Sequence, residues 1–348
     1  MFRPLLLENP YLQSVDHHDV DFQLRMYGLG AARPPSRGGP ALVVLTRSDD
    51  MEVSELSLGL AQRGVRLVRI NRDDPAGRAL GALRPDGIFH GQGEWLRTQA
   101  VWVRHFWDPG VRGDADRVHE AYFQEQLNAL PGTLSEVGGG AVVNAGSRIT
   151  SRVAQVAAAG VAGFAVPPTV VTHDLSRAVA ELGVGSGEDL VVKPLGSHWT
   201  SGGPDLLVGT FPVRVSVKEV CGRPLEPVPV IVQAYVAHES ELRVFIVGGV
   251  LLAYRVSGKS NARSLWDDSE AVRVESVDLG ECLAGRVRSF VAEHRVDLGA
   301  IDFLVQEDGT PVFLEINLVF DWRYFQKNAG DTRVSDALCE YFEGAVRA

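Results

Sequence analysis

Residues 298–318 read LGAIDFLVQEDGTPVFLEINL, and this stretch decides the fold. Two apolar runs flank the turn EDGT, which is typical of a β-hairpin. Asp302 interrupts the first run, and Glu315 and Asn317 interrupt the second, two positions apart and therefore on one face of that strand. Carboxylate and amide oxygens suit Mg²⁺. A polar face of a solvated hairpin would explain acidic residues in general. It does not explain why two acids and an amide interrupt strands that are otherwise apolar, so we favour a metal site.

A lysine ends another apolar strand in residues 189–205, DLVVKPLGSHWTSGGPD. If the Lys193 ammonium is buried, it needs an anionic partner, because an unpaired buried charge is costly. The loop that follows contains Ser201, Gly202 and Gly203, and glycine backbone N–H groups can approach phosphate oxygens closely. The segment predicts a site that binds a triphosphate. An alternative explains the same residues equally well: the aliphatic part of the lysine packs on the protein, its ammonium reaches water, and an ordinary hairpin follows.

A third group of polar residues lies in residues 230–256, VIVQAYVAHESELRVFIVGGVLLAYRV. Residues 233–236 follow an apolar strand and could hydrogen-bond an adenine edge, and Glu241 could hold ribose hydroxyls. Arg243 and Arg255, on successive strands, could neutralise a transferring phosphate or an acyl phosphate. An exposed charged hairpin is the alternative interpretation of this segment taken alone.

Composition narrows the class of protein. The chain has 348 residues, of which 45% are hydrophobic and 22% charged, and no apolar run reaches the roughly 18 residues of a membrane span. The formal charge of −10 argues against sequence-independent nucleic-acid binding. Three widely spaced cysteines suggest neither a disulfide framework nor a zinc site. The opening MFRPLLLENP is a poor secretory signal, so we expect a cytoplasmic protein.

Four segments are expected along the chain. Residues 1–40 end in a Gly- and Pro-rich linker, and residues 41–145 open with strand, helix and strand, the pattern of an open parallel α/β sheet. A further helix in this part is expected to end at its Pro-Gly pair. The GxGxxG loop of dinucleotide-binding domains does not follow the first strand. Residues 146–232 and 233–348 form two further lobes, mainly antiparallel sheet with few helices.

The ordered set VVKPLGS, VIVQAYV, ELRVFIVGG, AIDFLVQEDG and FLEIN resembles the ATP-grasp superfamily. Within it, the opening ALVVLTRSDD, the strand AVWVRHFW, the step VPPTVVT and the DW after EIN are most similar to the microviridin-type peptide macrocyclases, the graspetide synthetases. RimK-type amino-acid ligases are next. The resemblance spans roughly residues 41–330. It implies an α/β (α+β) ATP-grasp fold, in which an N-terminal open parallel α/β domain precedes two α+β lobes that clasp the nucleotide.

The resemblance also implies ATP and Mg²⁺ as cofactors and assigns roles by position. Arg243 and Arg255 become catalytic, Asp302, Glu315 and Asn317 become metal ligands, and the nucleotide is bound by Arg152, Lys193, Ser201, Gly202, Gly203, Gln233, Tyr235, Val236 and Glu241. Two departures stand out. Arg152 replaces a lysine that is frequent in the family, which keeps the charge but changes the reach. The loop NLVFDWRYF lacks the family's proline and glycine, so we expect a rebuilt substrate-side pocket.

The implied activity is an ATP-dependent carboxylate-amine or carboxylate-hydroxyl ligase that acts through an acyl phosphate. Its substrate would be a ribosomally made precursor peptide, cross-linked through side-chain esters or amides. One alternative is a RimK-like ligase that adds free amino acids to a peptide or small acid, and another is a non-catalytic nucleotide-binding partner protein. No nucleic-acid or membrane partner is expected, and a homodimer is one option that the sequence leaves open.

Overall fold

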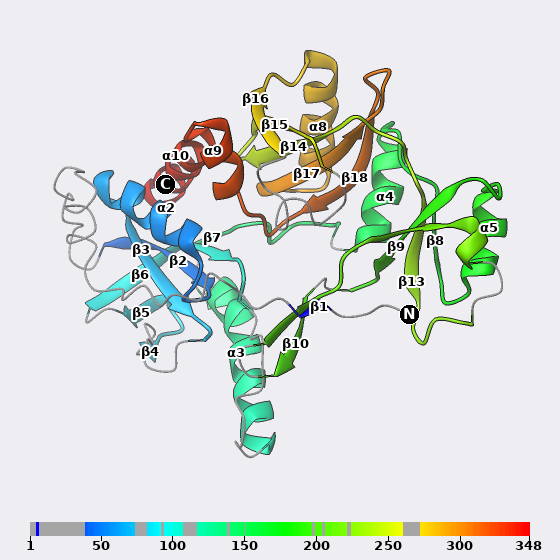
Figure 1. Cartoon of the computed structure of the whole chain (residues 1–348). Coiled ribbons are helices and arrows are strands. Elements are labelled where there is room, and N and C mark those ends of the chain that lie inside the picture. Colours follow the sequence, from blue (N-terminus) through cyan, green and yellow to red (C-terminus); the bar gives the residue numbers. More distant parts are fainter. Residues whose placement is uncertain are drawn as a thin grey trace.

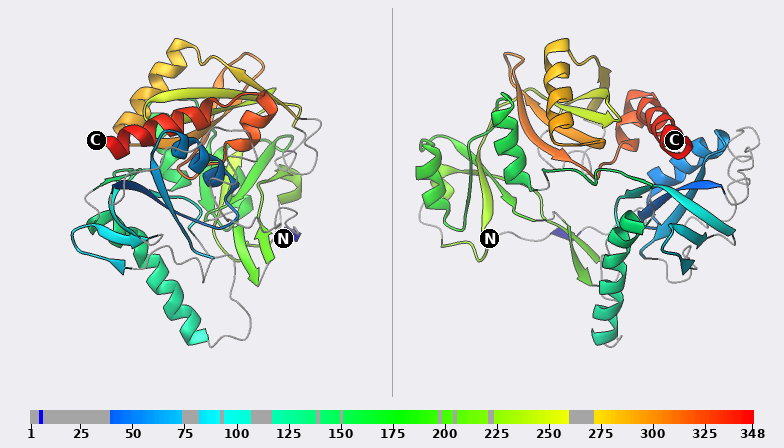
Figure 2. Two further views of the ribbon diagram at one scale, coloured as in Figure 1. Left: turned by 90° about the vertical axis from the view of Figure 1, so that its left-hand side faces the viewer. Right: turned by 180° about the vertical axis from the view of Figure 1, so that it is seen from behind.

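The computed structural model describes residues 5–6, 39–73, 82–91, 94–106, 117–137, 140–149, 151–196, 199–203, 206–220, 224–259 and 272–348. Three main sheets form three lobes that surround a common centre, as Figure 1 and the turned views of Figure 2 show. Within these ranges, the model has no helix whose length and apolar character would allow it to cross a membrane.

The first lobe is built on a sheet that contains the expected parallel strands and has two antiparallel strands at one edge. Its elements are β2 (Pro40–Thr46), α2 (Met51–Gln62), β3 (Arg66–Asn71), β4 (Ala82–Leu83), β5 (Ile88–Gly91), β6 (Glu94–Val103), α3 (Arg117–Val137) and β7 (Ala141–Val142). The strand order is β3-β2-β6-β5-β4 with β7 beside β6, and β2 runs parallel to both neighbours. Asp50 caps α2 by accepting the N–H of Val53 at 3.1 Å, a side-chain bond typical of helix starts.

Helix α3 differs from the expectation that it ends at Pro131-Gly132. It continues through the proline to Val137. The hydroxyl of Ser135 donates to the carbonyl of Pro131 at 2.7 Å, and that of Thr133 donates to the carbonyl of Ala129 at 2.9 Å. These bonds add partners for carbonyls in the turns around the proline, whose ring removes one helical N–H donor.

The second lobe is a small antiparallel sheet with helices beside it. Its elements are α4 (Arg152–Val161), β8 (Thr169–Thr172), α5 (Leu175–Leu182), β9 (Asp189–Pro194), β12 (Val213–Ser216), α6 (Val217–Val220) and β13 (Val230–Ala234). The strand order is β12-β9-β13-β8. Helix α5 ends at Gly183, which has φ 65° in the left-handed region. A separate sheet has the order β1-β11-β10, from β1 (Leu5–Leu6), β11 (Leu206–Gly209) and β10 (Trp199–Gly203).

The third lobe is a five-stranded antiparallel sheet with helices on both faces. Its elements are β14 (Ser240–Val247), β15 (Val250–Ser257), β16 (Arg273–Val277), α8 (Glu281–Glu293), β17 (Leu298–Val305), β18 (Pro311–Asn317), α9 (Arg323–Ala329) and α10 (Arg333–Arg347). The order is β16-β15-β14-β17-β18, so β17 and β18 form the predicted hairpin. Side chains of α8 and α4 pack on one face, and those of α9 and α10 pack on the other.

A shared core joins the first and third lobes. Buried side chains of the first lobe such as Leu42 lie in one cluster with Phe245 of the third lobe and Phe342 of α10. Trp102, near the end of β6, lies 5.1 Å from Phe342 and 6.2 Å from Trp322, measured between ring centroids. This packing holds the end of β6 close to the chain that follows β18.

Candidate active site

The two strands of the hairpin bring the predicted metal ligands together. Asp302 pairs with Glu315 and Ala300 pairs with Asn317 across the ladder, so the three polar side chains share a face. The amide nitrogen of Asn317 lies 3.0 Å from Asp302 Oδ2 and 3.3 Å from Glu315 Oε1. Arg243, opposite Asp302 on β14, places Nη1 at 3.1 Å from both carboxylate oxygens.

The electrostatics of this cluster fit a divalent cation. Burial raises the pKa of Asp302 to about 6, the nearby charges of Glu315 and Glu241 add to the rise, and Arg243 opposes it. Carboxylates that share a desolvated site are stabilised by a cation between them. The oxygen donors of Asp302, Glu315 and Asn317 are those that Mg²⁺ prefers.

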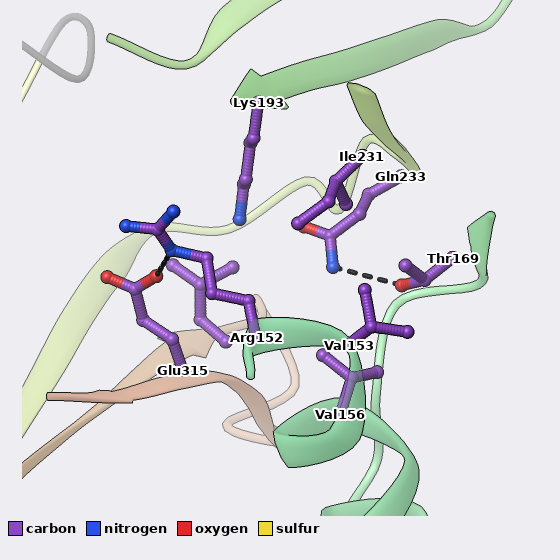
Figure 3. Close-up of a pocket in the computed structure, with 9 residues that line it drawn as sticks. Arg152, Val153, Val156, Thr169, Lys193, Ile231, Gln233 and Glu315 are labelled. Atoms are coloured by element: carbon purple, nitrogen blue, oxygen red, sulfur yellow. Dashed lines mark hydrogen bonds and ion pairs between the residues drawn. The ribbon is translucent and has the colours of Figure 1, made fainter. Parts of the chain in front are cut away.

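Lys193 projects from β9 toward this cluster, as Figure 3 shows. A pocket there is lined by Arg152, Val153, Val156, Thr169, Lys193, Ile231, Gln233, Leu314 and Glu315. Lys193 is only 6% exposed, and across the ranges that the structure describes its ammonium has no hydrogen bond or ion pair. Burial lowers its pKa, and the charge of Glu315 opposes this only in part. An unpaired buried ammonium of this kind marks a place for an anion.

Arg152 connects the second and third lobes at the mouth of the pocket. It is the first residue of α4, and its Nε lies 3.4 Å from Glu315 Oε2. Its Nη1 donates to the carbonyls of Pro194, at 3.3 Å, and Gly196. The guanidinium fork therefore binds β18 and the chain after β9 at once, which a single ammonium could not do in the same way.

The predicted adenine-side segment follows β13. Gln233 is buried, and its amide donates to Thr169 Oγ1 at 2.9 Å. The N–H of Tyr235 donates to the carbonyl of Asp189 at 3.0 Å, and the guanidinium carbon of Arg214 lies 3.7 Å from the centroid of the Tyr235 ring. The carbonyl of Val236 lies 2.8 Å from Nδ1 of His238. These contacts hold the segment where β13 leaves the sheet.

Of two further residues assigned from the resemblance, Glu241 lies near the acidic cluster and Arg255 does not. Glu241 is held by Lys259, whose ammonium is 2.7 Å and 2.8 Å from its two oxygens. Arg255 pairs with Leu242 and Glu275 in the ladder. It is therefore on the opposite face of the sheet from Arg243, and the structure does not bring it to the acidic cluster.

For the glycine-rich segment, the structure describes only the backbone. Ser201, Gly202 and Gly203 belong to β10, which pairs with β11 and has an irregular register after Ser201. Their side-chain surroundings lie outside the described part of the chain, and so do residues 197–198 and 204–205. The role of this segment over phosphates stays a prediction.

Comparison with known proteins gives matches only at the level of structure. No protein-family model and no curated protein sequence matches the chain. The ATP-grasp ligase PsnB, solved with a phosphomimetic variant of its minimal precursor, Mg and ADP, has a TM-score of 0.68 at 20% identity, over 89% of this chain and 99% of that one. The chain has the ATP-grasp fold.

Two further solved structures match over similar lengths. The macrocyclase MdnC from Microcystis aeruginosa MRC, solved with the precursor peptide MdnA, has a TM-score of 0.68 at 19% identity, over 86% of this chain and 98% of that one. A Chryseobacterium gregarium RiPP-associated ATP-grasp ligase, solved with ADP and a leader and core peptide, has a TM-score of 0.68 at 17% identity, over 87% and 96%. The predicted fold is thereby confirmed.

Sequence reasoning missed some residues that shape this pocket. Gln155, in the alanine-rich α4, is buried and accepts the N–H of Ile316 at 3.1 Å. Thr169 holds Gln233. A lone glutamine among alanines at a helical spacing that faces the core was an available signal for Gln155, whereas nothing local distinguishes Thr169.

Proposed function

We propose that the protein is an ATP- and Mg²⁺-dependent ligase that activates a carboxylate as an acyl phosphate and joins it to an amine or hydroxyl. The observation that carries this proposal is the unpaired, buried Lys193 directed toward the carboxylate of Glu315, which lies opposite Asp302 in the hairpin. The ammonium of Lys193 favours an anion in the pocket, and the carboxylates opposite it favour a cation. A polyphosphate with its metal supplies both.

Each residue has a defined part in this reaction. Asp302, Glu315 and Asn317 would hold Mg²⁺, which neutralises charge on phosphate oxygens when bound. Lys193 lies where its ammonium can bind phosphate oxygens, and Arg152 braces Glu315. Arg243, which contacts Asp302, is placed to counter the charge that develops as the phosphoryl group moves. Catalysis of this type depends on positioning and charge neutralisation, and needs no enzyme nucleophile.

For the substrate, we propose a ribosomally synthesised precursor peptide in which side-chain esters or amides are formed. Support comes from the PsnB, MdnC and C. gregarium ligases, which share the fold and were solved with precursor, leader or core peptides. A cytoplasmic location and a homodimeric state stay predictions. The product distinguishes this reaction from addition of free amino acids, because cyclisation loses water whereas addition increases the peptide's mass.

The experiment is calorimetric titration of a non-hydrolysable ATP analogue with Mg²⁺ into the wild type and the Asp302→Ala/Glu315→Ala double variant. Magnesium-dependent binding to the wild type that is lost in the double variant is the expected result. Glu307→Ala is the matched control, because it removes an exposed carboxylate from the turn of the same hairpin. Absence of binding to the wild type would overturn the proposal, and so would equal binding to the double variant.

A further inference from the structure

Arg104 forms a buried cluster of charges outside the site described above. It follows β6, at the edge of the first lobe's sheet where the parallel strands end. Its Nε lies 2.9 Å from Asp50 Oδ2, and its Nη2 lies 2.7 Å from Glu52 Oε2 and 3.0 Å from Asp321 Oδ1. Its Nη1 donates to the carbonyl of Phe320 at 2.6 Å. One guanidinium therefore binds two carboxylates of its own lobe and the loop after β18.

The same cluster fixes the path of that loop. The guanidinium carbon of Arg104 lies 5.1 Å from the ring of Trp102 and 4.9 Å from the ring of Trp322. Glu52 Oε1 accepts the N–H groups of Trp322, at 2.5 Å, and Arg323, at 2.8 Å, where α9 begins. The segment NLVFDW, which departs from the family pattern, is thus held by contacts that include both of its neighbouring lobes.

His105 and Asp321 form the exposed side of the cluster. His105 Nε2 lies 2.9 Å from Asp321 Oδ1, and the side chains are 28% and 65% exposed. Arg104 Nη2 also lies 3.2 Å from His105 Nε2. Its two hydrogens are used by the shorter contacts with Glu52, at 2.7 Å, and Asp321, at 3.0 Å. This leaves His105 Nε2 to donate its proton to Asp321. His105 Nδ1 then presents a lone pair, and it has no hydrogen-bond partner among the residues described. The pair has the arrangement of a base and its orienting carboxylate.

The position of the pair suits the substrate side of the reaction. Asp321 lies four residues after Asn317, so their Cα atoms are at most about 14 Å apart. Ligands of open α/β sheets bind at the carboxyl ends of the strands, which is where His105 lies. Phe325 of α9, in the core shared by both lobes, lies 5.0 Å from the Arg243 guanidinium. The pair and the acidic cluster are therefore linked to the same face of the third lobe's sheet.

A metal is a less satisfactory occupant of this cluster. Ligand atoms of Glu52, His105 and Asp321 lie within 4.8 Å of one another. However, the oxygens of Glu52 and Asp321 that face inward already accept N–H groups of Arg104. The exposed imidazole nitrogen has no such competitor.

We propose that His105, oriented by Asp321, is the general base of the acceptor step. The inference rests on the proposed function. His105 Nδ1 takes the proton of the attacking amine or hydroxyl as its nitrogen or oxygen bonds to the acyl carbon. The carbon-oxygen bond to phosphate breaks, inorganic phosphate leaves with the electron pair, and the imidazolium returns its proton to solvent. Asp321 stabilises the imidazolium.

The test separates donor activation from the acceptor step. Wild type, His105→Ala and His105→Gln are given ATP, Mg²⁺ and a pool of synthetic acidic peptides that contain Asp, Glu, Thr and Lys. Peptide cross-linking is followed by mass spectrometry, and the acyl phosphate is trapped by added hydroxylamine as a hydroxamate. Loss of a general base costs about 10²–10⁴-fold, so cross-linking should fall by that factor in both variants while hydroxamate formation persists. His173→Ala, an exposed histidine of the second lobe, should leave both rates unchanged.

Four outcomes would contradict the inference. If cross-linking is unchanged in both variants, no base is needed at His105. If cross-linking and hydroxamate formation are lost equally, His105 acts in donor activation or in folding. Wild type that forms neither product from the pool refutes the proposed function and the inference with it. Independently of substrate, nitrogen NMR of the wild type should show His105 protonated at Nε2, with Asp321→Asn disturbing this tautomer. Protonation at Nδ1 instead would overturn the inference alone.

Discussion

Replacement of Lys193 by methionine should stabilise the protein without its ligand and weaken nucleotide binding. The ammonium is buried and its pKa is lowered by desolvation. A lowered lysine pKa means that the folded state disfavours the charge, so at neutral pH the ammonium decreases the free energy of unfolding. This penalty disappears as the pH rises above the ordinary lysine value of about 10.5. Methionine fills a similar volume without the charge.

The magnitudes have opposite signs for stability and binding. Removing an uncompensated buried charge should raise the free energy of unfolding by about 1–3 kcal/mol. That corresponds to about 1–2 °C in Tm per kcal/mol, because the unfolding entropy of about 2.1 cal/mol/K per residue grows with chain length. Loss of a charge-assisted bond to phosphate costs about 1.5–3 kcal/mol, which is about 10- to 150-fold in Kd.

The assay pairs thermal unfolding of the ligand-free protein with calorimetric titration of an ATP analogue. Lys218→Met is the matched control, since Lys218 is exposed on α6 and should change neither quantity. A Lys193→Met variant that is less stable than the wild type would refute the reasoning. It would mean that Lys193 gains more from the charge of Glu315 than it loses by burial.

Three further predictions concern pH, thiol reactivity and the packing of α4. Burial raises the pKa of Asp302 to about 6, and a cation needs the deprotonated carboxylate. Mg²⁺-dependent nucleotide binding should therefore weaken about tenfold per pH unit below that value. Calorimetry at several pH values measures this dependence, and an affinity that does not change with pH would contradict the prediction. Iodoacetamide should label exposed Cys282 in the native protein and spare Cys339, whose burial raises its pKa to about 11, as peptide mass spectrometry will show. Gln155→Leu leaves the buried N–H of Ile316 without its partner, so urea unfolding should show a loss of about 1–3 kcal/mol; an unchanged midpoint would argue that the bond is dispensable.

The hairpin could be predicted because its information is local. Alternation of side chains along a strand places Glu315 and Asn317 on one face whatever else the chain does, and the turn EDGT brings Asp302 opposite. The strand, helix and parallel strand of the first lobe follow in the same way from patterns within a few residues. Helix α8 was not predicted, although its buried Val287, Phe290 and Val291 have the spacing of a helix face.

Other features of the site depend on contacts between distant residues. Arg243 and Arg255 look equivalent in the sequence, but the ladder places them on opposite faces of the sheet. Whether Lys193 reaches water or remains buried without a partner was undecided from its own segment, because the answer depends on Glu315 and on the packing of α4.

Local sequence patterns were enough for the acidic hairpin, since a two-residue period and turn chemistry act over short stretches. The ATP-grasp fold was expected from the resemblance of the ordered segments to that superfamily. Only the tertiary structure decided what surrounds these elements. Arg104 binds Glu52 and Asp321, which are 52 residues before and 217 residues after it in the chain. No local pattern encodes such a meeting, because it arises when α10 and the loop after β18 pack on the first lobe. The same packing places His105 beside Asp321, at the edge of the first lobe's sheet.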